Sequence, residues 1–364
     1  MLTDEHNDHE QDENLPNEPE TPTPPGAEDP METQPEEFVP QNRWGRNRLD
    51  VSIIKENVEN VRGELAKVLV GQQKMVDIML AAFFTDGHVL LEGVPGIAKT
   101  LTAKLLARAL GADFSRIQFT PDLMPSDVVG TTVFNMKTSE FTFNAGPVFS
   151  NIILIDEINR APAKTQAALF EVMEEAQVTI DGTTYPMEFP FFVMATQNPI
   201  EQEGTYKLPE AQLDRFVVKI NLEYPSLAEE KDILYRFRSD FKQKIKAEVD
   251  QVFTLEAIKK CRELIEQIHI EDALLDYIAN IVHDTRNNGD LYLGASPRAS
   301  LALLKMSKAV AAITGRDFVT PEDIQYVAYP VLNHRIILQP EREMEGYETR
   351  DIIKSILQKI EVPR

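Results

Sequence analysis

The stretch that decides the fold runs from His88 to Leu110 and reads HVLLEGVPGIAKTLTAKLLARAL. A short apolar run leads into a loop that contains two glycines and a proline, and an amphipathic segment opens at Lys99 and Thr100. This pattern predicts a strand, a loop and a helix, in the order that a phosphate-binding P-loop requires. The alternative is a chance glycine-rich turn between a strand and a helix.

A P-loop turns its backbone N–H groups inward and cradles phosphate oxygens at the N-terminus of the following helix. Lys99 is then expected to reach the β- and γ-phosphates, and the Thr100 hydroxyl is expected to ligate Mg²⁺. Ala98 stands where the strict pattern has glycine, but alanine presents the same N–H if this position has helical φ. The residues expected to contact the nucleotide are Gly93, Val94, Pro95, Gly96, Ile97, Ala98, Lys99, Thr100 and Leu101.

Length and composition suit a globular protein of two or three domains, because the chain has 364 residues and a domain takes roughly 150. The best apolar run, Ile78 to Phe84, is far shorter than the roughly 20 residues of a membrane span. The N-terminal MLTDEHNDHE has neither a basic flank nor an apolar core, so we expect no signal peptide. The single cysteine, Cys261, agrees with a reducing compartment, and we expect a cytoplasmic protein.

The net charge of −22 is concentrated at the start of the chain. Residues 1–44 contain 13 Asp and Glu residues and one basic residue, Arg43. This segment has few apolar side chains, so residues 1–45 are expected to form a disordered acidic tail. A partner-docking arm is the alternative to a solvating tail. The rest of the chain is acidic as well, which disfavours a broad footprint on a nucleic-acid backbone.

Two helices are expected before the P-loop strand. Apolar residues recur at helical spacing from Val51 to Val70, and a second helix is expected from Lys74 to Phe84. Between them, Val70 and Gly71 begin a break in the pattern. In P-loop proteins a backbone turn here can line the adenine pocket, so both residues are candidate nucleotide contacts. A simple turn between two helices is the alternative.

Beyond the P-loop helix, which is expected to end at Gly111, a second strand is expected from Arg116 to Thr120. Val133-Phe134 and residues 141–143 then flank a polar turn and predict an inserted hairpin. Such an insertion either presents a loop to a partner or is an ordinary surface hairpin. Another hairpin is expected around Asp181-Gly182, because this dipeptide between alternating residues favours a tight turn.

Two carboxylates follow a buried strand. The segment from Asn151 to Arg160 reads NIILIDEINR, and its four consecutive apolar residues predict a strand that is buried on both faces. Open α/β sheets bind ligands at the carboxyl ends of such strands. Asp156 is the expected partner of Mg²⁺ and its water, and Glu157 is expected to orient or polarise the attacking water. Simple helix caps are the alternative.

A further buried strand, residues 191–196, is followed by Asn198 and Pro199. If this strand neighbours the P-loop strand, Asn198 emerges beside the P-loop, where it can hydrogen-bond the γ-phosphate or the attacking water. The alternative role of Asn198 is to form a turn before Pro199.

Five linked motifs resemble those of the MoxR family of AAA+ ATPases, over roughly Ile53 to His334. They are, in order, GVPGIAKT, QFTPDLMPSDVVG, ILIDEINRAPAKTQ, ATQNPIEQEGTY and LPEAQLDRF. The resemblance implies a P-loop NTPase αβα core at residues 46–224, followed by an all-helical lid and a C-terminal helix at residues 225–364. It also implies a ring homo-oligomer, commonly hexameric in relatives, that uses ATP and Mg²⁺ and has a chaperone-like role.

The same resemblance assigns roles to individual residues. Lys99 and Thr100 match Walker A, Asp156 and Glu157 match Walker B, and Asn198 matches sensor 1.

Three arginines also match positions of the family. Arg215, in LDRF, matches the arginine finger that such enzymes insert into the ATP site of the neighbouring subunit. Arginine suits this role because its charge is permanent and its planar fork meets phosphate oxygens bidentately. Arg160 is a second candidate for a contact between subunits, and the sequence does not rank the two.

Arg298, in GASPR, matches sensor 2, which reaches from the lid to the phosphates; its alternative is a solvent-facing arginine in a first helical turn. Lys207 stands where relatives often have proline, in a loop, and affects no catalytic role.

We therefore expect Mg²⁺-dependent ATP hydrolysis that drives remodelling, maturation or metal insertion of a partner protein, and family analogy suggests a von Willebrand A-type partner. A nucleic-acid translocase would need basic pore loops, but the expected hairpins carry only Lys137 against Glu140 and Asp181. The ATPase subunit of a metal-chelatase-like complex, which has a similar core, is a further alternative. A nucleotide-binding scaffold without turnover is disfavoured by Glu157 and Asn198.

Overall fold

The computed structural model describes residues 49–94, 96–137, 139–199, 206, 208–238 and 249–363. The expected acidic tail at residues 1–45 lies outside the described residues, as do Pro95 and Lys207. All of the described residues belong to one compact unit, Arg48–Arg364.

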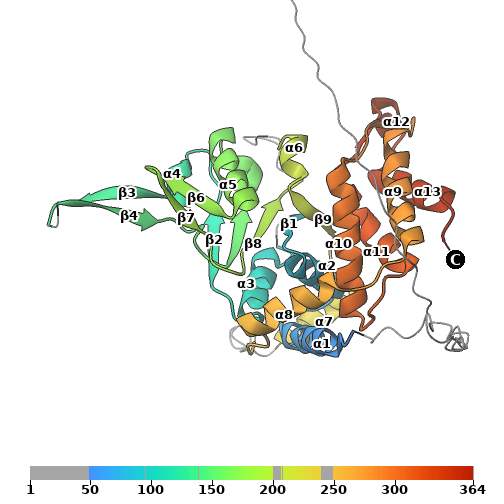
Figure 1. The fold of residues 1–364 in the computed structure, drawn as a ribbon, viewed down its shortest axis with the longest axis horizontal. Helices are drawn as coiled ribbons and strands as arrows, with labels where there is room; N and C mark the ends of the chain where they lie inside the picture. The colour runs from blue at the N-terminus through green and yellow to red at the C-terminus, as the bar shows by residue number, and fades with distance from the viewer. Residues whose placement is uncertain are drawn as a thin grey trace, which may run out of the picture. The chain divides into compact units, whose positions relative to one another are not determined.

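Five parallel strands form the central sheet, in the order β2-β5-β8-β1-β9. Their bounds are His88–Gly93 for β1, Phe114–Gln118 for β2, Ile152–Asp156 for β5, Phe192–Gln197 for β8 and Phe216–Leu222 for β9. The central strands β5 and β8 each begin with four consecutive apolar residues because helices cover both faces of the sheet (Figure 1). This architecture confirms the predicted α/β fold of a P-loop NTPase.

Helices on the two faces of the sheet enclose two apolar cores. Their bounds are Ser52–Ala66 for α1, Gln73–Phe84 for α2, Lys99–Ala109 for α3, Pro125–Val129 for α4 and Ala163–Glu175 for α5. Val89 and Leu91 of β1 belong to the core that α1, α2 and α3 cover. Leu90, between them, belongs to the core that α4 and α5 cover. This alternation of period two places the P-loop strand in the middle of three layers.

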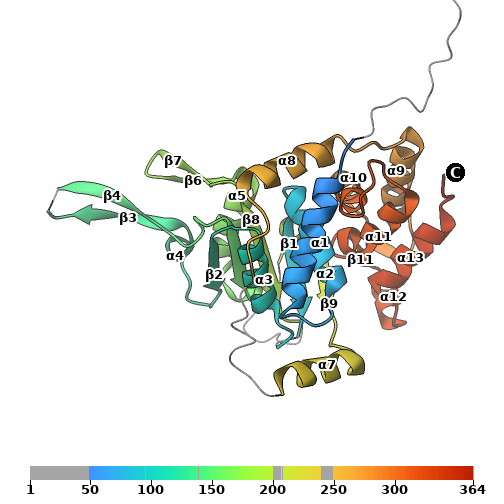
Figure 2. The same cartoon turned by 90° about the horizontal axis from the view of Figure 1, so that it is seen from below.

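Two β-hairpins interrupt the alternation of strands and helices. The first consists of β3 (Gly130–Asn135) and β4 (Glu140–Ala145), and the second of β6 (Gln177–Ile180) and β7 (Thr183–Pro186). The β3–β4 hairpin extends well beyond the sheet (Figures 1 and 2). Its Phe143 ring stacks on Tyr185 of β7, with ring centroids 4.3 Å apart. Both predicted hairpins are present, and the β6–β7 turn has positive φ at Asp181 and Gly182.

The C-terminal part of the chain is helical. Its elements are α7 (Leu227–Phe237), α8 (Leu255–Glu266), α9 (Asp272–Arg286), β10 (Leu291–Leu293), α10 (Pro297–Ile313), α11 (Pro321–Leu332), β11 (Ile337–Leu338), α12 (Pro340–Met344) and α13 (Thr349–Lys359). Helix α10 packs against α2 and α11, and α11 packs on β9, so the lid shares the core that α1, α2 and α3 cover. The helical lid is therefore confirmed, and the two short strands are an addition to it.

Element boundaries differ from the predictions by a few residues. Helix α1 ends at Ala66 rather than continuing to Val70, although Val68 and Leu69 stay buried beyond its end. Among the described helices, none is both long enough and apolar enough to cross a membrane.

Candidate nucleotide-binding site

Three strand ends build the site. The carboxyl ends of parallel strands lie along one edge of a sheet, and β8 lies between β5 and β1. The segments that follow these strands are therefore neighbours, and they carry Asp156-Glu157, Asn198 and the P-loop. The pairing of β1 with β8 meets the condition under which Asn198 emerges beside the P-loop. Ligands of open α/β sheets bind at this edge.

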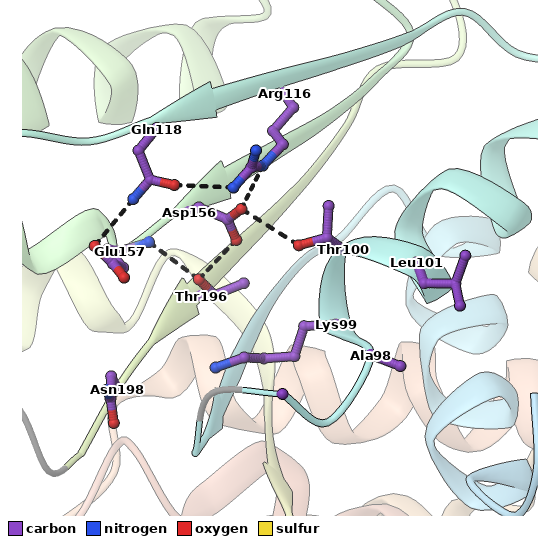
Figure 3. A pocket seen from close by; sticks show the side chains of 11 residues that line it. Ala98, Lys99, Thr100, Leu101, Arg116, Gln118, Asp156, Glu157, Thr196 and Asn198 are labelled. Atoms are coloured by element: carbon purple, nitrogen blue, oxygen red, sulfur yellow. Dashed lines mark hydrogen bonds and ion pairs between the residues drawn. The ribbon is translucent and has the colours of Figure 1, made fainter. Parts of the chain in front are cut away.

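A cavity of about 400 Å³ opens at the same edge (Figure 3). It brings together the side chains that the sequence assigns to phosphate, metal and water. The residues that line it are Gly96, Ala98, Lys99, Thr100, Leu101, Arg116, Gln118, Asp156, Glu157, Thr196 and Asn198.

The backbone of the P-loop explains its glycines. A Cβ atom at Gly93 would lie 2.7 Å from Ile97 Cδ1 and 2.9 Å from Leu222 Cβ, so only glycine fits there. The helical φ assumed for Ala98 from the sequence is wrong: Ala98 has a left-handed backbone, with φ of 60° and ψ of 22°. A left-handed alanine costs about 1 kcal/mol, which is why the strict pattern has glycine at this position.

The Lys99 ammonium group lies between the ends of β1 and β8. Its Nζ donates to the Gly93 carbonyl at 2.7 Å and lies 3.5 Å from the Gln197 carbonyl. Figure 3 shows the side chain extending across the cavity toward Asn198. A lysine in this position can exchange carbonyl partners for phosphate oxygens, which fits the predicted role of Lys99.

The Asp156 carboxylate is buried and has three side-chain partners. Thr196 Oγ1 donates to it at 3.1 Å, and Thr100 Oγ1 at 3.4 Å. Arg116 Nε donates to the same carboxylate at 2.6 Å. Mg²⁺ prefers hard oxygen ligands, so the adjacent Thr100 hydroxyl and Asp156 carboxylate fit this ion.

Glu157 is held in a strained conformation. Its φ of 58° is left-handed, and its N–H donates to Thr196 Oγ1 at 3.0 Å. Its carboxylate accepts a hydrogen bond from Gln118 Nε2 at 2.9 Å and pairs with Arg160 Nε at 3.0 Å. Within the described part of the chain, this carboxylate does not cap the short helix η1 (Ile158–Arg160) that follows. Strain that is held by several contacts is typical of functional sites.

Three residues of the cavity are absent from the sequence-based prediction. Arg116 and Gln118 lie two residues apart on β2, and Gln118 is level with Asp156 of β5. The period of two on a strand places both side chains on one face. Thr196, near the end of β8, contacts both Walker B residues. Knowledge of the strand order would have been needed to predict that these residues line the cavity.

Arg215 and Arg298 lie together on one carboxylate. Arg215 Nη1 is 2.5 Å from Glu174 Oε2, and Arg298 Nη2 is 2.6 Å from Glu174 Oε1. Arg215 follows helix α6 (Glu210–Leu213), and Arg298 lies in the predicted first turn of α10. Neither arginine is among the described residues that line the P-loop cavity.

A second cavity, of about 660 Å³, begins at the turn between α1 and α2 and is lined by Val70 and Gln72. Gln72 Nε2 donates to the Ile97 carbonyl at 3.1 Å, which ties this turn to the P-loop. Gln72 Oε1 is buried and has no hydrogen-bond partner among the described residues. A buried amide oxygen needs a donor, and the amino group of adenine can supply one. Gly71 in the same turn has a φ of 69°, which favours glycine.

Comparison with known proteins agrees with this geometry. Residues 88–218 match the model of the "ATPase family associated with various cellular activities (AAA)", and residues 283–356 match the "AAA lid domain". The chain is 46% identical over 303 residues to the uncharacterized protein YeaC of Bacillus subtilis, covering 82% of this chain and 92% of that protein. It is 44% identical over 310 residues to the chaperone MoxR1 of Mycobacterium tuberculosis, covering 83% and 81%. A crystal structure from Cytophaga hutchinsonii has 45% sequence identity and a TM-score of 0.79, covering 86% of this chain and 97% of the other.

Proposed function

The chain belongs to the MoxR family of AAA+ ATPases, and on this premise we propose that it hydrolyses ATP with Mg²⁺ and thereby remodels a partner protein in the cytoplasm. One observation carries the proposal: Lys99, the Thr100–Asp156 pair and Glu157 surround a single cavity at the carboxyl edge of the sheet. We further propose that residues 46–224 form the ATPase core and residues 225–364 the lid, which the two family matches support.

Each side chain has a distinct task in this proposal. Bound ATP and Mg²⁺ supply the scissile phosphoanhydride bond and the charge neutralisation that its cleavage requires. Lys99 binds phosphate oxygens, and the Thr100 and Asp156 oxygens hold the ion. Glu157 accepts the proton of the attacking water, and Gln118 keeps its carboxylate aimed into the cavity. Asn198 orients the same water. Val70 and Gln72 line the proposed base site, whereas Gly71, in the same turn, lines a different cavity together with Arg62 and Arg236.

The arginines point to a site shared between subunits. Arg215 and Arg298 share Glu174 away from the P-loop cavity of their own chain, so we assign both to the phosphates of a neighbouring subunit. Arg160 pairs with its own Glu157, so we assign it to positioning this carboxylate within one subunit. The proposed assembly is a closed ring of head-to-tail contacts, and we propose that it has six subunits.

The direct test is phosphate release by the purified chain. With Mg²⁺ and ATP we expect steady turnover, and chelation of Mg²⁺ is expected to lower it by ~100-fold or more because the ion neutralises the developing charge. Re-addition of Mg²⁺ should restore the rate. Turnover that is insensitive to chelation, or absent from assembled protein with Mg²⁺, would contradict the proposal.

The β3–β4 hairpin supplies a surface for a protein client. Phe134 and Phe141 pair on it with ring centroids 5.0 Å apart, and Phe141 is 73% exposed. Met136, at 88% exposure, lies near the tip. Exposed aromatic and methionine side chains favour an apolar polypeptide segment. Among the described residues of the two hairpins, Lys137 is the only basic side chain, and Glu140 and Asp181 are acidic. This charge disfavours the nucleic-acid alternative.

Replacement of the aromatic pair tests this surface. The double variant Phe134→Ser/Phe141→Ser is expected to weaken binding of a reduced, alkylated model protein about 10-fold, because it removes two exposed aromatic contacts. Its basal ATP turnover should stay within about 2-fold of wild type. Met344→Ser is the matched control, since Met344 is 89% exposed but lies on the lid helix α12. Equal binding by all three proteins would exclude the hairpin as the client surface.

A further inference from the structure

A single carboxylate joins two arginines that come from different parts of the chain. Glu174 lies near the end of α5, Arg215 lies between α6 and β9, and Arg298 lies in the first turn of α10 (Figure 1). Each oxygen of the carboxylate takes one arginine: Oε2 is 2.5 Å from Arg215 Nη1 and Oε1 is 2.6 Å from Arg298 Nη2. The tips of the two arginines are therefore held side by side.

The backbone segments that carry the two arginines are joined as well. Asp214 immediately precedes Arg215, and its carboxylate accepts a hydrogen bond from Ser296 Oγ at 2.8 Å. Ser296 is the N-cap residue of α10, two positions before Arg298. The buried Arg335 donates to the same carboxylate at 2.6 Å. The Asp214 carboxylate thus links the backbone segments that carry the two arginines, and the Glu174 carboxylate links their guanidinium groups.

This arrangement leaves the guanidinium groups able to meet an anion. Arg215 Nη1 contacts Glu174 and donates to the Phe170 carbonyl at 2.7 Å. A guanidinium has five N–H donors in a planar fork, so each arginine retains donors for phosphate oxygens. Two cations held this close repel each other, and the shared carboxylate offsets that repulsion. The hydrogen bond from Arg298 lowers the pKa of Glu174, so the carboxylate is ionised at neutral pH.

We propose that Glu174 is a positioning residue that holds Arg215 and Arg298 as one unit, so that a subunit presents both cations to its neighbour's phosphates in a single step. The inference rests on the proposed function, because it assumes that the two arginines act across the subunit interface. It extends that function by making the lid and the finger engage together, since Arg298 belongs to the lid and Arg215 to the core.

The test replaces Glu174 with its neutral isostere. Glu174→Gln is expected to lower kcat about 10-fold while KM for ATP stays within about 2-fold, because the arginines lose their alignment and the P-loop is untouched. Glu175→Gln is the matched control: it removes the same charge from the next residue of α5, which makes no ion pair among the described residues. The control is expected to have the wild-type kcat, and both variants the wild-type unfolding temperature.

A second measurement separates positioning from general damage. In an Arg215→Ala/Arg298→Ala background, Glu174→Gln should cause no further loss of turnover, because nothing remains for the carboxylate to align. A further 10-fold loss in that background, or wild-type kcat in the single variant, would overturn the inference. If the Arg215→Ala/Arg298→Ala protein itself keeps wild-type turnover, the assignment of the arginines fails first, and the inference falls with the proposed function rather than on its own.

Discussion

Glu157→Gln is expected to bind ATP as the wild-type protein does and to hydrolyse it at least ~100-fold more slowly. Binding should persist because Lys99 and Thr100 are unchanged and glutamine keeps the length of the side chain. Its amide oxygen can still accept the hydrogen bond that Gln118 Nε2 donates at 2.9 Å. What disappears is the carboxylate that we propose takes the proton of the attacking water. Equilibrium binding of ATP, measured beside single-turnover hydrolysis, separates the two effects.

A matched control for this variant lies on α5. Glu171→Gln removes a charge from an exposed position away from the cavity and should leave turnover within about 2-fold of wild type. Near-normal turnover in Glu157→Gln would reject Glu157 as the activating carboxylate. Loss of ATP binding would instead mean that Glu157 holds the strained strand end in place.

Local sequence patterns were sufficient for the parts of the site that lie on one segment. The P-loop and the Asp156-Glu157 pair each join a buried strand to a polar end, and neighbours in sequence are neighbours in space at such positions. Asn198 required one further condition, the pairing of β8 with β1, and the structure meets it. The left-handed φ of Ala98 could not be predicted from the sequence, because alanine favours the right-handed helical conformation.

Contacts between segments could not be predicted in this way. Arg116 and Gln118 contact Walker B carboxylates only because β2 pairs with β5, and a single sequence does not state the strand order. The meeting of Arg215 and Arg298 on Glu174 depends on how α10 packs beside the core. That packing is decided by apolar contacts among α2, α10 and α11, which carry no motif.

Arg215→Ala is expected to keep ATP affinity within a few-fold of wild type and to lower turnover by ~10³ or more, the range for loss of an arginine finger. The reason is that Arg215 lies outside its own P-loop cavity. Its proposed role is to stabilise charge only as the γ-phosphate of a neighbour departs. Mixing this variant with Lys99→Ala subunits gives the sharper measurement. Each variant alone lacks one half of every shared site, whereas a mixed ring contains interfaces with an intact P-loop on one side and an intact Arg215 on the other. Turnover should therefore reappear on mixing.

Arg160→Ala mixed with Lys99→Ala serves as the matched control, because Arg160 pairs with Glu157 of its own chain at 3.0 Å. If Arg160 acts within its subunit, every site in that mixture still lacks either Lys99 or Arg160, and turnover stays low. Co-assembly of the two variants, followed with two different affinity tags, must be demonstrated in both mixtures. If the mixture of Arg215→Ala and Lys99→Ala subunits co-assembles but shows no turnover, Arg215 is excluded as the arginine finger. Recovery in the Arg160→Ala mixture would then transfer the role to Arg160, because only a residue that acts across the interface can complement a defective P-loop.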